Sequence, residues 1–212
     1  MSSVAQPGAA RAPAVNPFGM FDVGDVRALV EEFPLAWTMT PDGALAHASQ
    51  LPLIGEYDAD GRLVALIGHL ARANPLARAM AAQCRINILF NGPSGYVSPE
   101  HAGRRNWAPT WNYAQLKIDA AVEIGAHLTS HSLDVLIGVT EHGRADPWQV
   151  REIADRYDVM AAAIIGFRAR VLAVQGKFKL GQDEDAGTLH HILATHPDPV
   201  LVRWMRRLNA GR

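Results

Sequence analysis

Short apolar runs separated by turn-forming residues dominate this chain, and this pattern limits the folds it can adopt. The 212 residues include 18 Gly and 13 Pro. Segments such as PDG at 41–43 and YDADGR at 57–62 separate runs that read as strands. Helical patterns do not alternate regularly with these strands, which disfavours a doubly wound parallel sheet. The pattern predicts a mainly β (α+β) protein, an antiparallel barrel with peripheral helices.

About six strands and several short helices are expected along the chain. The strands are predicted at 35–40, 44–54, 63–68, 85–90, 111–124 and 167–180. The helices are predicted at 22–33, 75–83, 128–142, 157–165 and in two pieces within 183–208. Pro52 should place the second strand at an edge or a bulge, and NGPSG at 91–95 should end the fourth. Asn74 as N-cap and Pro75 at the first helical position mark the start of the second helix.

Charge and cysteine content exclude several classes of protein. The formal net charge is −1, so no global field attracts nucleic acid or an acidic membrane. The single cysteine, Cys84, excludes an intrachain disulfide framework and is expected to pack in a buried strand. We see no apolar run of membrane-spanning length and no signal-like apolar core at the N-terminus, so a cytoplasmic protein is expected.

Composition also suggests how the chain is organised. Residues 1–17 are rich in Ala, Pro, Ser and Gly and are predicted to form a mobile tail. A folded domain is expected over 18–182, followed by a helical extension over 183–212. Within that extension, RWMRR at 203–207 fits an amphipathic packing helix better than a nucleic-acid reader.

The segment GHLARANP places His69 and Arg72 between a predicted strand and a predicted helix start. A helix N-terminus presents unpaired N–H groups and the positive end of the helix dipole, and an arginine adds a forked donor. This arrangement suits a phosphate group. The alternative is that both side chains are solvated turn residues.

Two later segments are also candidate binding elements. In APTWNY, a strand would place Trp111 and Tyr113 on one face and Asn112 on the other. A planar heterocycle could contact either face, or the aromatic rings could be core or interface residues. In GKFKL, Lys177 and Lys179 share a strand face and could hold a phosphate, or could be a solvated edge that blocks strand pairing.

Metal sites are not expected from the sequence. DADG at 58–61 is similar to the start of a calcium loop, but the twelfth position from Asp58 is His69 where that loop needs Glu. The nine histidines show no zinc-binding spacing and no pairing with cysteine. No residue stands out as a catalytic acid or base, although His69 and His101 are the natural candidates for mutation.

Four segments together resemble a known family. GHLARANP, FNGPSGYVSP, APTWNY and GKFKLGQ occur in an order and spacing similar to those of the PaiB-like proteins, the FMN-binding negative transcriptional regulators. The resemblance spans 21–182. It implies a split β-barrel related to flavin reductases and pyridoxamine phosphate oxidases, and a homodimer with FMN near the subunit interface. Besides regulation, an FMN-dependent oxidoreductase or flavin reductase, or a protein that has lost FMN and binds haem or another planar ligand, remains an alternative.

The resemblance also implies the residues of the cofactor site. Residues 69–74 would wrap the FMN phosphate, with Arg72 as the main cation and the N–H groups of the turn as neutral donors. Residues 49–51 would run beside the flavin, Asn112 would hydrogen-bond to it, and late residues of the same or the other subunit would close the site. The implied cofactor-binding residues are Ser49, Gln50, Leu51, His69, Leu70, Arg72, Asn74, Trp111, Asn112, Tyr113, Lys177, Lys179 and Gln182.

The chain differs from the family pattern at three places. Gln50 stands where the family's SHLPL has His. The family's YVSPSWY is replaced by YVSPEHAG, which changes the loop at 100–103. The family's KLSQNR is replaced by KLGQDE, so Asp183 and Glu184 stand in place of Asn and Arg. A carboxylate that faced a phosphate dianion would weaken its binding.

Overall fold

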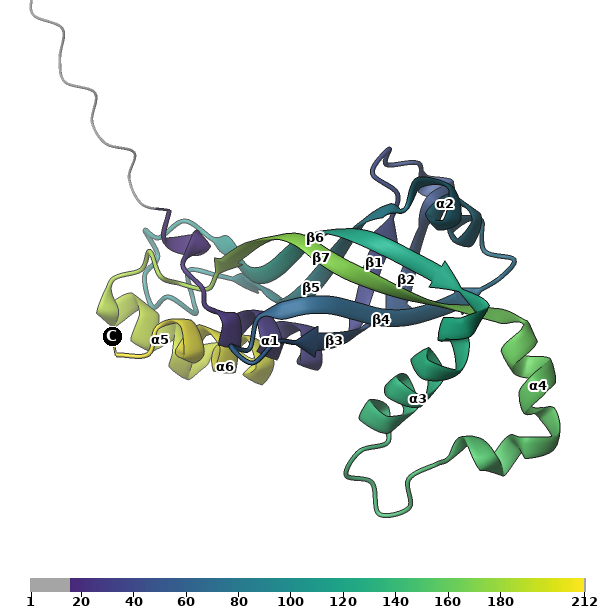
Figure 1. Cartoon of the computed structure of the whole chain (residues 1–212). Coiled ribbons are helices and arrows are strands. Elements are labelled where there is room, and N and C mark those ends of the chain that lie inside the picture. Colours follow the sequence, from purple (N-terminus) through teal and green to yellow (C-terminus); the bar gives the residue numbers. More distant parts are fainter. Residues whose placement is uncertain (1–15, 212) are drawn as a thin grey trace, which may run out of the picture.

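A curled, seven-stranded antiparallel sheet forms the centre of the molecule (Figure 1). The structure is a computed structural model that describes residues 16–211. The strand order across the sheet is β2-β1-β5-β6-β7-β4-β3. The strands are β1 (Leu35–Met39), β2 (Ala48–Pro52), β3 (Ile54–Tyr57), β4 (Leu63–Ala71), β5 (Arg85–Val97), β6 (Thr110–Gly125) and β7 (Ile164–Lys179). The predicted antiparallel split barrel with peripheral helices is confirmed, whereas the predicted tail lies almost entirely outside the described residues.

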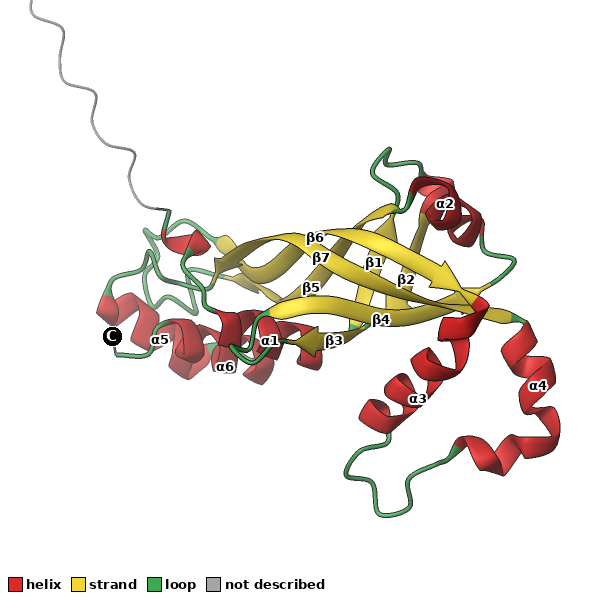
Figure 2. Ribbon diagram, in the orientation of Figure 1, coloured by secondary structure: helices red, strands yellow, loops and turns green. Residues whose placement is uncertain are grey.

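Helices lie at both ends of the sheet and beneath it (Figure 2). Short 3-10 turns at Pro17–Gly19 (η1), Leu45–His47 (η2), Ala126–Leu128 (η3) and Val150–Ile153 (η4) join some of the elements. The α-helices are α1 (Val23–Glu32), α2 (Pro75–Gln83), α3 (Thr129–Thr140), α4 (Ala154–Ala162), α5 (Ala186–Thr195) and α6 (Pro199–Leu208). The segment between β6 and β7, residues 126–163, contains α3 and α4 and is called the insert below.

The predicted end of a strand at NGPSG is wrong, because β5 continues to Val97. Asn91 pairs with Gln115 and Ser94 pairs with Tyr113, so β5 uses one more residue than β6 over this stretch. A bulge of this kind accommodates Pro93, which has no N–H to donate to the ladder. The long β5–β6 pair carries the sheet well beyond the barrel core.

Three other local predictions also need correction. The run at 44–54 is divided into η2, β2 and β3, since Pro52 ends β2. The helix predicted at 157–165 begins at Ala154 and ends at Ala162, because Ile164 is the first residue of β7. Cys84 is exposed and ends α2 in the left-handed region, with φ of 53°, so it is not part of a buried strand.

The inner face of the sheet packs on α1 and α6. Phe90, Leu116 and Phe178 of the sheet are fully buried, and Trp204 of α6 is 2% exposed. Glu32 of α1 accepts hydrogen bonds from Trp204 Nε1, at 3.1 Å, and from Arg203. These contacts confirm that RWMRR belongs to an amphipathic packing helix.

The insert packs on the outer face of β4 and β7 at one end of the barrel (Figure 1). Gly166, near the start of β7, pairs with Gly125 of β6, and its N–H donates to Thr129 Oγ1 at 3.2 Å. A Cβ added at Gly166 would lie 2.3 Å from the main-chain oxygen of Leu128. Glycine is therefore required where the insert crosses the barrel.

Gly166→Ala is expected to lower the free energy of unfolding by about 2 kcal/mol, because the added methyl group meets rigid main chain. The midpoint of urea denaturation measures this loss. Gly138→Ala on α3 is the matched control, since a Cβ there meets nothing within 4 Å. An alanine in a helix interior should leave stability unchanged or raise it. Equal denaturation midpoints for the Gly166 variant and the parent would contradict the close approach.

Candidate cofactor site

The corner between β4 and α2 is tied to β2 by Asn74. Its Oδ1 caps α2 by accepting a hydrogen bond from Leu76 N at 3.0 Å, as the sequence predicts for this N-cap. Its Nδ2 donates to Ser49 Oγ at 2.9 Å. Two segments that are far apart in sequence, 49–51 and 69–74, therefore meet at this corner.

Most main-chain donors of this corner are already used within the chain. Arg72 N donates to Ala163 O, and Asn74 N donates to Ala71 O, both at 2.9 Å. Ala77 N donates to Asn74 O at 3.0 Å. A phosphate at the corner would therefore depend on side chains more than on the N–H groups of the turn.

Cations and a hydroxyl are available at the corner. Arg72 is exposed, and its Nε donates to Ala162 O at 2.9 Å. Its terminal nitrogens make no hydrogen bond with the described residues. Ser49 Oγ accepts from Asn74 and keeps its own hydrogen to donate. A polar cleft of about 420 Å³ beside the start of α2 is lined in part by His47 and Arg78.

The sequence analysis did not select His47 or Arg78. Arg78 lies four residues after Asn74, one turn along the same helix face, and this spacing was the available signal. His47 enters only because η2 packs beside α2, which is a tertiary contact.

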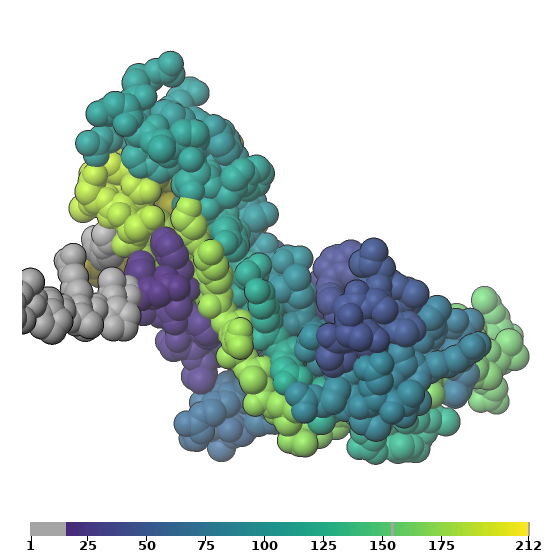
Figure 3. Space-filling view, turned by 90° about the horizontal axis from the view of Figure 1, so that it is seen from above, coloured from purple at the N-terminus to yellow at the C-terminus, as the bar shows by residue number. Residues whose placement is uncertain are grey.

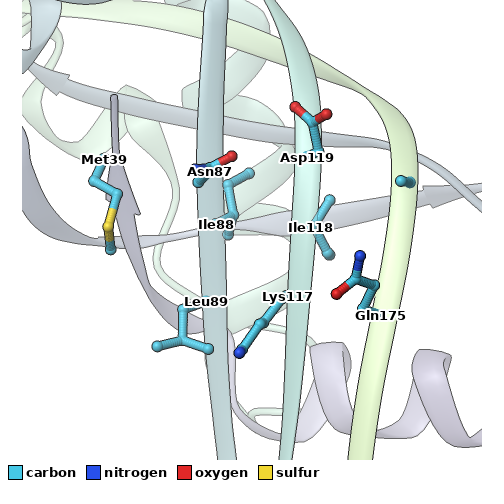
Figure 4. Close-up of a pocket in the computed structure, with 9 residues that line it drawn as sticks. Met39, Asn87, Ile88, Leu89, Lys117, Ile118, Asp119 and Gln175 are labelled. Carbon is cyan, nitrogen blue, oxygen red and sulfur yellow. The ribbon is translucent and has the colours of Figure 1, made fainter. Parts of the chain in front are cut away.

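A groove of about 340 Å³ lies on the outer face of β1, β5, β6 and β7 (Figure 4). Leu89 pairs with Lys117, and Lys117 pairs with Gln175, so these side chains form a row across three strands. A second row joins Asn87 and Asp119. Apolar groups thus form the floor, and amide, ammonium and carboxylate groups form the rim.

The same outer face is apolar toward β1 and β2. Trp37 pairs with Leu89 on one side and with Gln50 on the other, which extends the row toward the corner. Trp37 is 39% exposed and Leu35 is 53% exposed. Seen from above in Figure 3, this face is hollowed between a teal lobe at one end and a blue lobe at the other.

Four predicted site residues from later in the chain lie on the outer face, at the end of the sheet opposite the corner. They are Trp111, Tyr113, Lys177 and Lys179. Tyr113 pairs with Lys179 in the β6–β7 ladder, and Lys179 Nζ donates to Thr110 Oγ1. The ammonium of Lys177 lies 5.4 Å from the centre of the Tyr113 ring, a cation–π contact. Trp111 is 58% exposed beside them.

Several predicted residues point away from the outer face. Asn112 is 2% exposed, and its Nδ2 lies 3.6 Å from Met205 Sδ of α6. Leu51 and Leu70 are buried in the core, so they could reach a ligand only through their main chain. Gln182 closes a local turn, with its side chain bonded to Leu180 N and Phe178 O.

The predicted site residues come from an early part of the chain, 49–74, and a late part, 111–182. Within one copy, the far ends of these two sets are widely separated. His69 pairs with Gly166 of β7, whereas Tyr113 pairs with Lys179 of the same strand. These two positions of β7 are 13 residues apart, which is roughly 40 Å of extended strand. His69 and Lys179 therefore cannot contact one ligand within a single copy. Gln50 lies nearer to the late residues, because its row on the outer face ends at Gln175, two residues before Lys177.

His69 does not belong to the corner between β4 and α2. It lies under the insert, in a cavity lined mostly by apolar residues of the insert. Its Nδ1 is buried and has no hydrogen-bond partner among the described residues. Burial lowers the pKa of the His69 imidazole, because the charged form is poorly solvated there.

The part of the chain from 16 to 211 contains no group of three or more His, Cys, Asp or Glu side chains arranged to hold a metal ion. No helix in that part is both long and apolar enough to cross a membrane.

Comparison with known families agrees with this geometry. A family model described as "Putative FMN-binding domain" matches residues 15–173, which is most of the chain. The chain belongs to this family. The match supports FMN as the cofactor and confirms the resemblance to PaiB-like proteins, because the *Bacillus subtilis* protein PAI 2 is also similar.

Individual proteins are similar to this chain at low sequence identity. The *Bacillus subtilis* relative, named protease synthase and sporulation protein PAI 2, is 25% identical over 170 residues, 79% of this chain and 81% of its own length. An uncharacterized protein of *Aspergillus fumigatus* is 31% identical over 161 residues, 58% of this chain. The matched region is 62% of that relative's length.

Solved structures share the fold. The flavocytochrome Anf3 of *Azotobacter vinelandii* superposes with a TM-score of 0.54 at 14% identity, over 76% of this chain and 69% of that one. An FAD and heme binding protein of *Mycobacterium smegmatis* gives a TM-score of 0.52 at 18% identity, over 81% of this chain and 77% of that one. At these identities the comparison establishes the split-barrel fold alone.

Proposed function

We propose that this protein is a homodimer that holds FMN between its subunits and uses it for redox chemistry on a small molecule or electron carrier. The observation that carries the proposal is the row Gln50–Trp37–Leu89–Lys117–Gln175 across the outer face of the sheet. It runs from the open groove to Gln50, which is next in sequence to Ser49 of the cationic corner. A ligand with an anionic tail and a planar ring could use both places if its tail passed the edge of β2.

The corner residues fit a phosphate group. Arg72 supplies a forked cation, and Ser49 supplies a hydroxyl donor held in place by Asn74. Arg78 and His47 add positive potential from the neighbouring cleft. In this proposal these side chains replace the main-chain donors that the turn has already used.

The groove residues fit a planar ring with polar edges. Leu89 and Met39 provide apolar contact, and Asn87 and Gln175 provide amide donors and acceptors at the rim. The Lys117 ammonium would stabilise negative charge on a bound ligand. Bound FMN supplies hydride or electron transfer, while the protein positions it and excludes water.

A second copy would supply the late residues. The outer face exposes Leu35 and Trp37, which suits an isologous contact between two copies. Such a contact would allow Trp111, Tyr113, Lys177 and Lys179 of the partner subunit to cover the groove that one copy leaves open. This arrangement would bring Lys179 of the partner subunit toward the Arg72 corner, which lies at the other end of β7, roughly 40 Å from Lys179 of the same chain.

The regulatory role implied by the family resemblance has less support from this geometry. On α6, Arg203 contacts Glu32, and Arg207 Nε lies 2.6 Å from Asp25 Oδ1, so these cations neutralise carboxylates of α1. Any DNA contact would have to use another surface or a partner protein. The haem alternative has no imidazole ligand in the groove, because none of the described residues that line it is histidine.

Absorption spectroscopy and size-exclusion chromatography test this proposal together. The protein should retain FMN through desalting and elute as a dimer at micromolar concentration. Bleaching of the flavin by NADH or NADPH would support redox chemistry. Retardation of promoter DNA that persists at raised salt would favour regulation instead. A monomer that does not retain FMN would overturn the proposal.

A further inference from the structure

The insert covers a second cavity, separate from the groove on the outer face. The cavity has a volume of about 240 Å³. It lies between the end of β4, α3, η4 and α4. Its lining residues are His69, Leu133, Ile137, Trp148, Val150, Ile153, Tyr157, Met160, Ala161 and Ile164.

Among the described residues that line this cavity, His69 carries a buried side-chain nitrogen without a hydrogen-bond partner. The hydroxyl of Tyr157, which also lines the cavity, donates to Ser130 Oγ at 3.2 Å. His69 Nδ1 is buried and has no hydrogen-bond partner among the described residues. A buried polar atom without a partner is costly, so it is a candidate ligand contact.

The chemistry of the lining restricts the ligand. A neutral imidazole offers one donor nitrogen and one acceptor nitrogen. Apart from the bonded Tyr157 hydroxyl and the indole N–H of the part-exposed Trp148, the other lining groups are apolar. A charged ligand would therefore lose its hydration with little compensation. An apolar ligand with a single N–H or O–H would instead satisfy the histidine.

The volume sets the size of the ligand. A dry apolar cavity of about 150 Å³ accepts benzene. A cavity of about 240 Å³ therefore suits an aromatic molecule of two fused rings. Trp148 and Tyr157 add aromatic surface for ring contacts.

We propose that the cavity under the insert is a binding site for a neutral, two-ring aromatic molecule that donates one hydrogen bond to His69. The proposal concerns residues that do not line the groove, so it does not depend on FMN. A small aromatic substrate or effector could then be held by the insert while the outer face carries the cofactor.

Titration calorimetry with indole and indene tests the site, because the two probes have similar shapes and only indole carries an N–H group. Indole is expected to bind about tenfold more tightly than indene, the size of effect expected for one buried hydrogen bond. His69→Phe should remove the difference between the two probes. Equal binding of indole and indene to the parent protein, or binding of neither, would overturn the proposal.

Two further variants locate the site. Leu133→Trp should fill the cavity and abolish binding of both probes. Val159→Trp is the matched control, because Val159 lies on α4, is 77% exposed and does not line the cavity. Retention of the parent melting temperature and of the parent circular dichroism spectrum would show that each variant is folded. Indole binding that survived in a folded Leu133→Trp variant would place the ligand elsewhere and overturn the proposal.

Discussion

Arg72→Ala is expected to weaken FMN binding by about 1.5–3 kcal/mol, roughly a 10- to 150-fold rise in the dissociation constant. Arg72 is exposed at the β4–α2 corner, and the only hydrogen bond of its side chain among the described residues uses Nε. Most of the neighbouring main-chain donors are committed within the chain, so they can compensate little for the lost cation. Fluorescence titration of FMN into the cofactor-free protein measures the change.

Arg62→Ala is the matched control for this prediction. Arg62 lies in the β3–β4 turn and pairs with Asp60 at 2.7 Å. Its removal also deletes one exposed arginine, but it should leave FMN affinity unchanged. Arg72 Nε also donates a hydrogen bond to Ala162 O, so its loss could lower stability. The melting temperature of the Arg72→Ala variant is therefore compared with that of the parent protein. A stable Arg72→Ala variant with unchanged affinity would exclude Arg72 from the phosphate site.

Sequence patterns predicted the barrel because its signals are local. Alternation of apolar residues marks β6, and Asn74–Pro75 marks the start of α2. The bulge at Pro93 was missed because the continuation of β5 depends on pairing with β6, which a local reading of NGPSG does not include. Cys84 was misplaced for a similar reason, since its left-handed conformation belongs to the end of α2.

The candidate site was only partly predictable. The sequence motifs found the corner at Arg72 and Asn74, and the structure adds the contact to Ser49. The groove beside Lys117 and Gln175 was not predicted, because it arises from side chains that three strands place in one row. Strand alternation alone puts each residue on the outer face, but only the register makes them neighbours.

Two departures from the family pattern are connected in the structure. Trp107, which follows the altered loop, donates from Nε1 to Glu184 Oε2 at 3.0 Å. Arg104 of the same segment pairs with Asp185 at 2.7 Å. The pKa of the Glu184 carboxyl is raised, mainly because partial burial disfavours its charged form. The acidic residues near 183–185 thus hold the altered loop, and within one chain they lie at the end of the sheet opposite the Arg72 corner.

Leu89→Asp is expected to convert the proposed dimer into monomers and to abolish FMN retention in the same variant. Leu89 lies in the middle of the outer row, so a twofold contact would bury two new carboxylates. Even beside Lys117, a carboxylate buried at the centre of an interface loses hydration that the ion pair does not fully repay. A cost of about 3–4 kcal/mol would raise the dimer dissociation constant by roughly 100- to 1,000-fold. In the free subunit, Lys117 lies directly opposite and can pair with the new aspartate, so the fold should survive.

Light scattering coupled to size-exclusion chromatography measures the oligomeric state of this variant, and desalting followed by absorption spectroscopy measures FMN retention. Val159→Asp is the control, because it places the same charge on an exposed residue of the insert, away from the outer face of β1 and β5. If both losses occur together in Leu89→Asp alone, the site requires the partner's late residues. A monomer that still retained FMN would show that one copy holds the cofactor without the partner's late residues, and would contradict the proposed site between subunits.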